Sequence, residues 1–378
     1  MKRYRFTGAT KDNNLIIKNN NLVKKIFSDQ KNYKLYFCEN VMFERSNTIN
    51  LDTIYIEDPA FVLNAHETAF YHFFISGLGE YLLIKNILKE FGKDLKLIIL
   101  HDTGNDENII KNTYKETILN TIKNIEYIKY ETTDRIIFNE LFFIDTKQNL
   151  FLSKNFSNYD FNESNTFMDI NLHYLISMQS HINKNFISNY ESKKIFLTRG
   201  NSLNGVKKTD KFFKNINDLN DFKKNKKFLQ DFFDEFNINN FDDIDKNIFL
   251  ENKFNEYNQR YISDDEEKKI VDYFLNNEYE IINPEEIGIK KQIELCMKAS
   301  HVATLTGSNS VSSIFCNQHT KFILLNNNTN YEFFHPKIVK TFIKNNLILF
   351  DKDVVGKKFF SIDDIIIELT NNHKGFIN

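Results

Sequence analysis

The residues best suited to chemistry form a short polar turn, Thr306-Gly307-Ser308-Asn309-Ser310, between a strand-like run and a helical pattern. Hydroxyl groups and backbone N–H groups at the start of a helix bind anions such as phosphate. Glycine in such a turn lets a ligand approach the backbone closely. Ser and Asn are also the best helix caps, so the same turn could simply cap a helix. Both interpretations stay open on this stretch alone.

Two arginines, like the turn above, lie next to predicted strands or helices. Arg199 directly follows the strand-like run KIFLT. Arg260 comes just before a second predicted helix, which begins with Ser263 as its cap and has Glu266 three positions later. A guanidinium group forms a bidentate fork to phosphate, so both arginines are candidate phosphate ligands. The alternative for each is an ordinary surface arginine on a loop.

A second group of residues could move a proton. His72 titrates near neutrality and lies between Tyr71 and Phe73, where burial could tune its pKa. Glu67, Glu80 and the strand-end Asp102 are the competing general bases. A core histidine with a satisfied partner is the structural alternative for His72. The sequence therefore leaves the base open, with His72, Glu80 and Asp102 as the catalytic candidates.

Composition limits the function classes. Apolar residues make up 41% and charged residues 26%, as in ordinary globular proteins, and the net charge of −2 does not favour nucleic acid as a partner. The three cysteines share no metal-ligand spacing, and the acidic run 242–245 lies in a charged segment, so no metal site is expected. No signal peptide and no membrane-spanning run is expected. The expected location is the cytoplasm, with peripheral contact at the inner face of the membrane left open.

The elements that position these residues alternate between strand and helix. Runs 279–282, 301–305 and 322–325 with helical patterns between them predict a parallel βαβαβ unit, and the first half of the chain also alternates. Gly77 and Gly79 interrupt a helical pattern and predict a kink near 76–80. We expect an N-terminal domain over 1–187 and a C-terminal domain over 188–355. A helical insertion is expected at about 203–258, and the helix in 356–378 is expected to pack back toward the first domain.

The ordered motifs resemble those of glycosyltransferase family 61. The matching stretches are KIFLTRG with Arg199, RYISDDEE with Arg260, INPEEIGIKKQI with Glu285 and Gln292, ATLTGSNSVSSIF with Gly307, and, more weakly, YHFFISGLGEYLL with His72. Two motif positions differ. Thr306 and Ser308 stand where the family has His and Ala, and Ser76 stands at the acidic position four after His72, with Glu80 one turn further on.

The resemblance implies an α/β, GT-B-like fold in which two Rossmann-like domains face a central cleft. It also implies an inverting, metal-independent hexosyl- or pentosyltransferase that needs no cofactor besides a nucleotide-sugar donor, expected to be UDP-linked. The acceptor would be an oligosaccharide or a lipid-linked glycan in capsule or lipopolysaccharide/lipooligosaccharide biosynthesis. The donor-binding residues would be Arg199, Arg260, Glu285, Gln292, Thr306, Gly307, Ser308, Asn309 and Ser310.

Several alternatives remain open at this point. Glu285 could bond hydroxyl groups of the donor or only favour a helix N-terminus, and Gln292 could contact the ligand or be solvated. A pyruvyl- or phospho-transferase of envelope glycans, or an inactive glycan-assembly subunit, would share the same architecture. A homodimer is neither required nor excluded.

Overall fold

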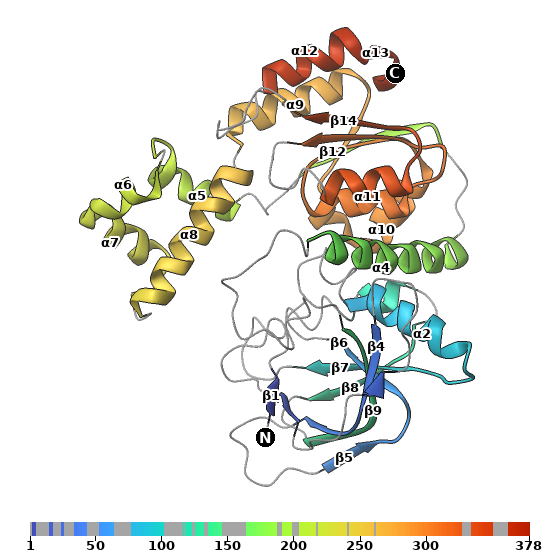
Figure 1. Cartoon of the computed structure of the whole chain (residues 1–378). Coiled ribbons are helices and arrows are strands. Elements are labelled where there is room, and N and C mark those ends of the chain that lie inside the picture. The colour runs from blue at the N-terminus through green and yellow to red at the C-terminus, as the bar shows by residue number, and fades with distance from the viewer. Residues whose placement is uncertain are drawn as a thin grey trace. The chain divides into compact units, whose positions relative to one another are not determined.

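The protein divides into two compact units, Met1–Ile187 and Ser188–Asn378. The computed structural model describes residues 2–4, 15–17, 24–25, 34–43, 53–63, 77–101, 116, 118–122, 125–131, 135–145, 164–186, 191–198, 204–216, 218–239, 242–260, 262–326, 334–350 and 362–378. Each unit carries a sheet with parallel strand pairs (Figure 1). The predicted mixed α/β class is therefore confirmed.

The first unit is built on a seven-stranded sheet of order β3-β4-β9-β6-β7-β8, with β5 also paired to β9. Its strands are β3 (Lys24–Lys25), β4 (Lys34–Phe43), β5 (Thr53–Ile56), β6 (Ala60–Leu63), β7 (Lys96–His101), β8 (Tyr127–Glu131) and β9 (Arg135–Asp145). The pairs β6–β7, β7–β8, β5–β9 and β6–β9 are parallel, whereas β3–β4 and β4–β9 are antiparallel. A separate antiparallel pair joins β1 (Lys2–Tyr4) to β2 (Leu15–Ile17).

Among the described residues of this unit, α2 (Glu80–Lys89) and α4 (Ser164–Asn185) are long enough to bury an apolar stripe. Helix α2 buries Tyr81, Ile84 and Leu88, and the Tyr81 hydroxyl donates to Leu95 O at 3.4 Å. A single π-helical turn over residues 77–79 precedes α2. Such turns often occur at functional sites, and this one lies within the segment where the two glycines predicted a kink.

The second unit contains a fully parallel five-stranded sheet of order β11-β10-β12-β13-β14. Its strands are β10 (Lys193–Leu197), β11 (Glu280–Ile282), β12 (Ala299–Leu305), β13 (Lys321–Asn326) and β14 (Asn346–Phe350). All seven residues of β12 are buried, as expected for a central strand covered on both faces. The predicted parallel unit is thus present.

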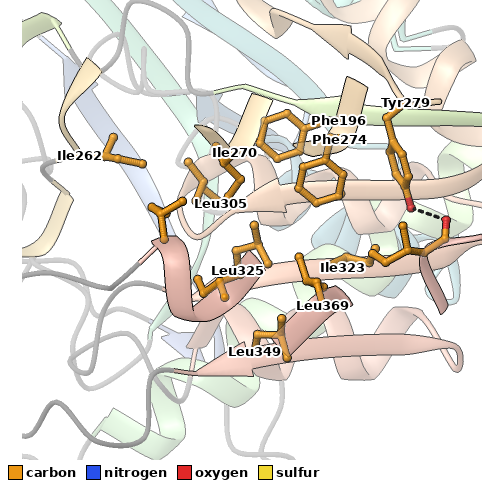
Figure 2. Close-up of a cluster of buried hydrophobic side chains, with 14 residues drawn as sticks. Phe196, Ile262, Ile270, Phe274, Tyr279, Leu305, Ile323, Leu325, Leu349 and Leu369 are labelled. Atoms are coloured by element: carbon orange, nitrogen blue, oxygen red, sulfur yellow. Dashed lines mark hydrogen bonds between the residues drawn. The ribbon is translucent and has the colours of Figure 1, made fainter. Parts of the chain in front are cut away.

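Helices cover both faces of this sheet (Figure 1). They are α9 (Asp264–Asn276), α10 (Pro284–Lys298), the 3-10 helix η4 (Ser308–Phe315), α11 (Phe334–Phe342), α12 (Ile362–Asn372) and the short α13 (Lys374–Ile377). On one face, Phe274 of α9 stacks on Phe196 of β10 with ring centroids 4.5 Å apart, and Leu369 of α12 packs into the same core (Figure 2). The predicted cap of α9 is confirmed, because Ser263 and Glu266 form a complete capping box.

The C-terminal helices belong to this core. Ile362, Ile365 and Leu369 of α12 are buried in it, and the hydroxyl of Tyr279 donates to Ile377 O of α13 at 3.2 Å (Figure 2). The C-terminal helix, expected to pack toward the first domain, thus has Ile362, Ile365 and Leu369 buried inside the second unit, because they complete the sheet's core with α9, whereas Ile367 is exposed.

Between β10 and β11 the chain forms a helical insertion of α5 (Asn204–Phe213), α6 (Leu219–Lys224), α7 (Lys226–Glu235) and α8 (Asp243–Arg260). It has its own core, made mainly of phenylalanines: Phe212, Phe213, Phe222, Phe232, Phe233 and Phe254, with Ile238, Leu250 and Tyr257. The Tyr257 hydroxyl donates to Asp210 at 2.7 Å. The rings meet edge to face or tilted, as in other aromatic cores.

Candidate active site

The strand order of the second unit defines a topological switch point. In chain order the five strands run 2-1-3-4-5 across the sheet, so the connections leaving β10 and β12 go in opposite directions. In open α/β sheets ligands bind outside the carboxyl ends of the strands at this point. We use the name carboxyl edge for the ends of β10, β11 and β12 at Leu197, Ile282 and Leu305.

The centre of the carboxyl edge is Thr198, the residue after β10. Its N–H donates to Ile282 O of β11 at 2.9 Å, and its carbonyl accepts from Asn309 Nδ2 of η4 at 2.7 Å. One residue therefore joins the chain leaving β11 to the turn that follows β12. Sequence analysis missed Thr198, although its place at the end of an apolar run was a usable signal.

The turn after β12 has a backbone that only glycine adopts easily. Gly307 has φ 145° and ψ −160°, a region essentially closed to other residues. Ser310 lies fully buried, and both its N–H (3.0 Å) and its hydroxyl (2.8 Å) donate to Gly307 O. The turn opens a 3-10 helix, and Gly307 provides no side-chain cap. The N–H groups at this helix start stand at the carboxyl edge, where an anion would meet them.

Two predicted ligands in this turn hold the backbone. Thr306 is 3% exposed, and its N–H (2.8 Å) and hydroxyl (3.0 Å) both donate to Leu325 O at the end of β13. Asn309 uses its amide nitrogen on Thr198, as described above. The side chain of Ser308 lies outside the described part of the protein. At the family's histidine position the chain thus has a buried hydroxyl that supports the turn.

The first turn of α10, which follows β11, also lies at the carboxyl edge. Asn283 caps α10: its Oδ1 accepts from Glu285 N–H at 3.2 Å, and its Nδ2 donates to Glu286 at 2.7 Å. Glu285 is exposed at the first turn of the helix. Gln292 is buried, and its Nε2 donates to Pro284 O at 2.5 Å. Thr198 follows β10, which lies between β11 and β12 in the sheet. Glu285 follows β11 and the 306–310 turn follows β12, so the two lie on either side of Thr198.

The structure describes the remaining predicted site residues only in part. Arg199, His72, Glu67 and Asp102 lie outside the described residues. Arg260 is the last residue of α8, and only its backbone position is described.

Glu80 is the first residue of α2 and is 8% exposed. The side chain thus stands at the positive end of the helix dipole.

Cofactor signals are few in this part of the chain. No group of three or more His, Cys, Asp or Glu residues that could hold a metal ion occurs among the described residues. No helix in the described ranges is long and apolar enough to span a bilayer. Cys296 and Cys316 are buried free thiols in direct contact, and burial raises the pKa of Cys316.

Comparison with known proteins agrees with the ordered motifs. The sequence profile of the family described as Glycosyltransferase 61 matches residues 70–323, more than half of the chain. The match includes the segments of His72, Arg199, Arg260, Glu285 and the 306–310 turn. A search of curated proteins gave no match. The chain therefore belongs to glycosyltransferase family 61, and this membership implies a sugar donor and a glycan acceptor as its substrates.

Proposed function

We propose that the protein is an inverting glycosyltransferase that moves a hexose or pentose from a nucleotide-sugar, UDP-linked in the first instance, to an oligosaccharide or lipid-linked glycan. The acceptor belongs to capsule or lipopolysaccharide/lipooligosaccharide biosynthesis. The second unit binds the donor and the first unit the acceptor, in a GT-B arrangement of two domains around a cleft. A cytoplasmic location, at the inner face of the membrane, gives access to both substrates, and a homodimer is compatible with this assignment.

The observation that supports donor binding most strongly is the double hydrogen bonding of Thr198 at the switch point. It brings the first turn of α10 and the Gly307 turn to one edge, and Arg199 is the next residue in the chain. A diphosphate leaving group without a metal needs fixed cations and N–H dipoles. Arg199 and Arg260 would supply the charge, and the start of η4 would supply the N–H groups. No obligatory metal or further cofactor is needed in this scheme.

Transfer also needs a base that takes the proton of the acceptor hydroxyl. His72, Glu80 and Asp102 all belong to the first unit, which the proposal assigns to the acceptor. Of these, Glu80 is described, as the largely buried first residue of α2. His72 is the residue whose ordinary pKa suits a base near neutral pH.

The test is nucleotide binding by thermal shift, with UDP, GDP, CDP and CMP at millimolar concentration in the presence of EDTA. A ligand at ten times its Kd stabilises the folded state by about 1.4 kcal/mol, and we expect this for at least one nucleotide. Arg199→Ala and Arg260→Ala should remove the shift and stay folded. Lys214→Ala, an exposed cation of the insertion, should keep it.

Three outcomes separate the alternatives. If no nucleotide moves the midpoint, the glycosyltransferase assignment of this site is wrong. If a nucleotide binds but the matching nucleotide-sugar releases no nucleoside diphosphate, with or without acceptor, the inactive assembly subunit is favoured, in line with Thr306 at the histidine position. If release occurs and His72→Ala leaves it unchanged, the base is Glu67, Glu80 or Asp102.

A further inference from the structure

Helix α10 consists of two pieces that meet at Gly288. This residue has φ 67° and ψ 160°, far from helical values, so Pro284–Ile287 form a separate turn ahead of the main helix. A Cβ on Gly288 would meet no atom within 4 Å. The glycine is therefore required for its backbone conformation and not for space.

The main piece of α10 is firmly held. It buries Ile289, Ile293 and Cys296, and it contacts β10, β12 and η4. The turn before Gly288 has only Pro284 fully buried among its residues, with Glu285 and Glu286 exposed. A helix break of this kind leaves the short turn dependent on side-chain hydrogen bonds for its orientation.

Gln292 supplies such a bond across the break. Its Nε2 donates to Pro284 O at 2.5 Å, over a separation of eight residues, and its side chain is 8% exposed. On the other side, Asn283 accepts from the N–H of Glu285 at 3.2 Å. The turn is thus held at its start by Asn283 and from the main helix by Gln292.

We infer that Gln292 is a positioning residue, which orients the Pro284–Ile287 turn so that Glu285 meets a hydroxyl group of the donor, and that Gln292 itself does not contact the donor. The inference rests on the proposed function of the carboxyl edge. Its physical basis is that the Gln292 side chain is buried, at 8% exposed, and that one of its amide hydrogens bonds the Pro284 carbonyl, where loss of the bond would leave a buried acceptor unpaired. Glu285 lies exposed in the first turn of α10, which follows the end of β11.

The first arm of the test needs no ligand. Hydrogen exchange of the amides in 285–288 is compared between the wild type and Gln292→Leu, which keeps the volume and removes the donor. We expect at least tenfold faster exchange in the turn, with residues 290–297 unchanged. Equal protection in both proteins would overturn the inference. If Gln292→Leu does not fold, Gln292→Glu serves instead, because an ionised carboxylate cannot donate.

The second arm is a double-mutant cycle on nucleotide affinity, measured by calorimetry with UDP, or with whichever of GDP, CDP and CMP stabilises the wild type. Gln292→Leu and Glu285→Gln should each weaken binding about tenfold. The double variant should be no weaker than either single variant, since both act through one contact. A roughly hundredfold loss in the double variant would make Gln292 an independent ligand and overturn the inference. So would an unchanged affinity in Gln292→Leu.

A matched control separates this effect from a general loss of a glutamine. Gln230 of α7 also donates its side-chain amide, to Asp234 at 2.9 Å and Asn239 at 3.0 Å, but it is exposed. Gln230→Leu should change neither readout. Absence of any nucleotide binding to the wild type would contradict the proposed function, whereas the exchange experiment would still decide whether Gln292 holds the turn.

Discussion

The two edges of the C-terminal sheet use polar side chains for opposite purposes. At the carboxyl edge, Asn309 and Gln292 donate to backbone carbonyls of chain segments that leave the sheet. At the amino edge, where β10, β12 and β13 begin at Lys193, Ala299 and Lys321, carbonyl groups of α13 accept hydrogen bonds from Lys321 and Tyr279. Under the proposed function, the first arrangement shapes turns that would present groups to the donor, and the second closes the core.

The amino edge is closed by hydrogen bonds and aromatic contacts. Lys321 Nζ donates to Gly375 O at 3.2 Å and lies 5.6 Å from the ring centroid of Phe376. Lys194 Nζ lies 5.7 Å from the ring of Tyr279, and that ring meets His301 edge to face. These groups have no role in the proposed reaction. The comparison therefore predicts that changes at the amino edge alter stability alone, while changes at the carboxyl edge alter nucleotide binding.

The largest expected effect concerns His301, which is 6% exposed and shares a 2.9 Å hydrogen bond between its Nδ1 and the Ser300 hydroxyl. Burial, and then the charges of Lys321 and Lys194, lower the pKa of His301 from 6.5 to about 4. Between pH 6.5 and 4, His301 is therefore protonated in the unfolded chain but stays neutral in the folded chain. The free energy of unfolding should fall by about 3 kcal/mol between pH 6.5 and 4 from this group.

Urea unfolding of the wild type and His301→Phe at both ends of this window measures that contribution. The variant should lose less stability on acidification by about 3 kcal/mol, and its nucleotide binding at pH 7 should be unchanged. His319→Gln, at an exposed histidine, controls for the loss of a surface imidazole. An identical pH dependence in wild type and His301→Phe would show that His301 does not make the amino edge acid-sensitive.

The next effect tests the carboxyl edge through its backbone. Gly307→Ala places a side chain at φ 145°, which costs about 2 kcal/mol in strain or forces the turn to change. Either result should weaken the nucleotide-induced thermal shift. The matched control is Gly375→Ala at the amino edge, where a Cβ would meet nothing within 4 Å. A Gly307→Ala variant with full nucleotide binding would remove this turn from the donor site.

The contrast between the edges also shows what a sequence can specify. Local patterns predicted the parallel unit and the capping box of Ser263, because periodicity and caps depend on neighbours in the chain. They could not predict the strand order, which depends on where each crossover packs. For the same reason Asn309 looked like a cap or a ligand and is bonded to Thr198, over a hundred residues away in the chain. This contact depends on β10 and β12 being neighbouring strands in the sheet, which the sequence alone does not show.

A second limit applies to α10. A glycine inside a helical pattern is only a weak sign of a break. The sequence pattern alone therefore did not predict the break at Gly288. The reason for the break is tertiary: the main helix packs on the sheet, while the first turn follows the end of β11. Thr306 is similar, because the hydroxyl that replaces an imidazole has its partner, Leu325 O, on another strand. Motif comparison singled out Thr306, and only the packing shows what its hydroxyl bonds.

The smallest expected effect is also the strictest test of the comparison. Tyr279 is 2% exposed, and burial raises the pKa of its hydroxyl, which donates to Ile377 O at 3.2 Å. Tyr279→Phe keeps the ring and should lower the free energy of unfolding by about 1 kcal/mol, with Tyr55→Phe at an exposed tyrosine as the control. The nucleotide-induced shift should not change. If it falls together with stability, the two edges are coupled through the strands, and the division of roles between them is wrong.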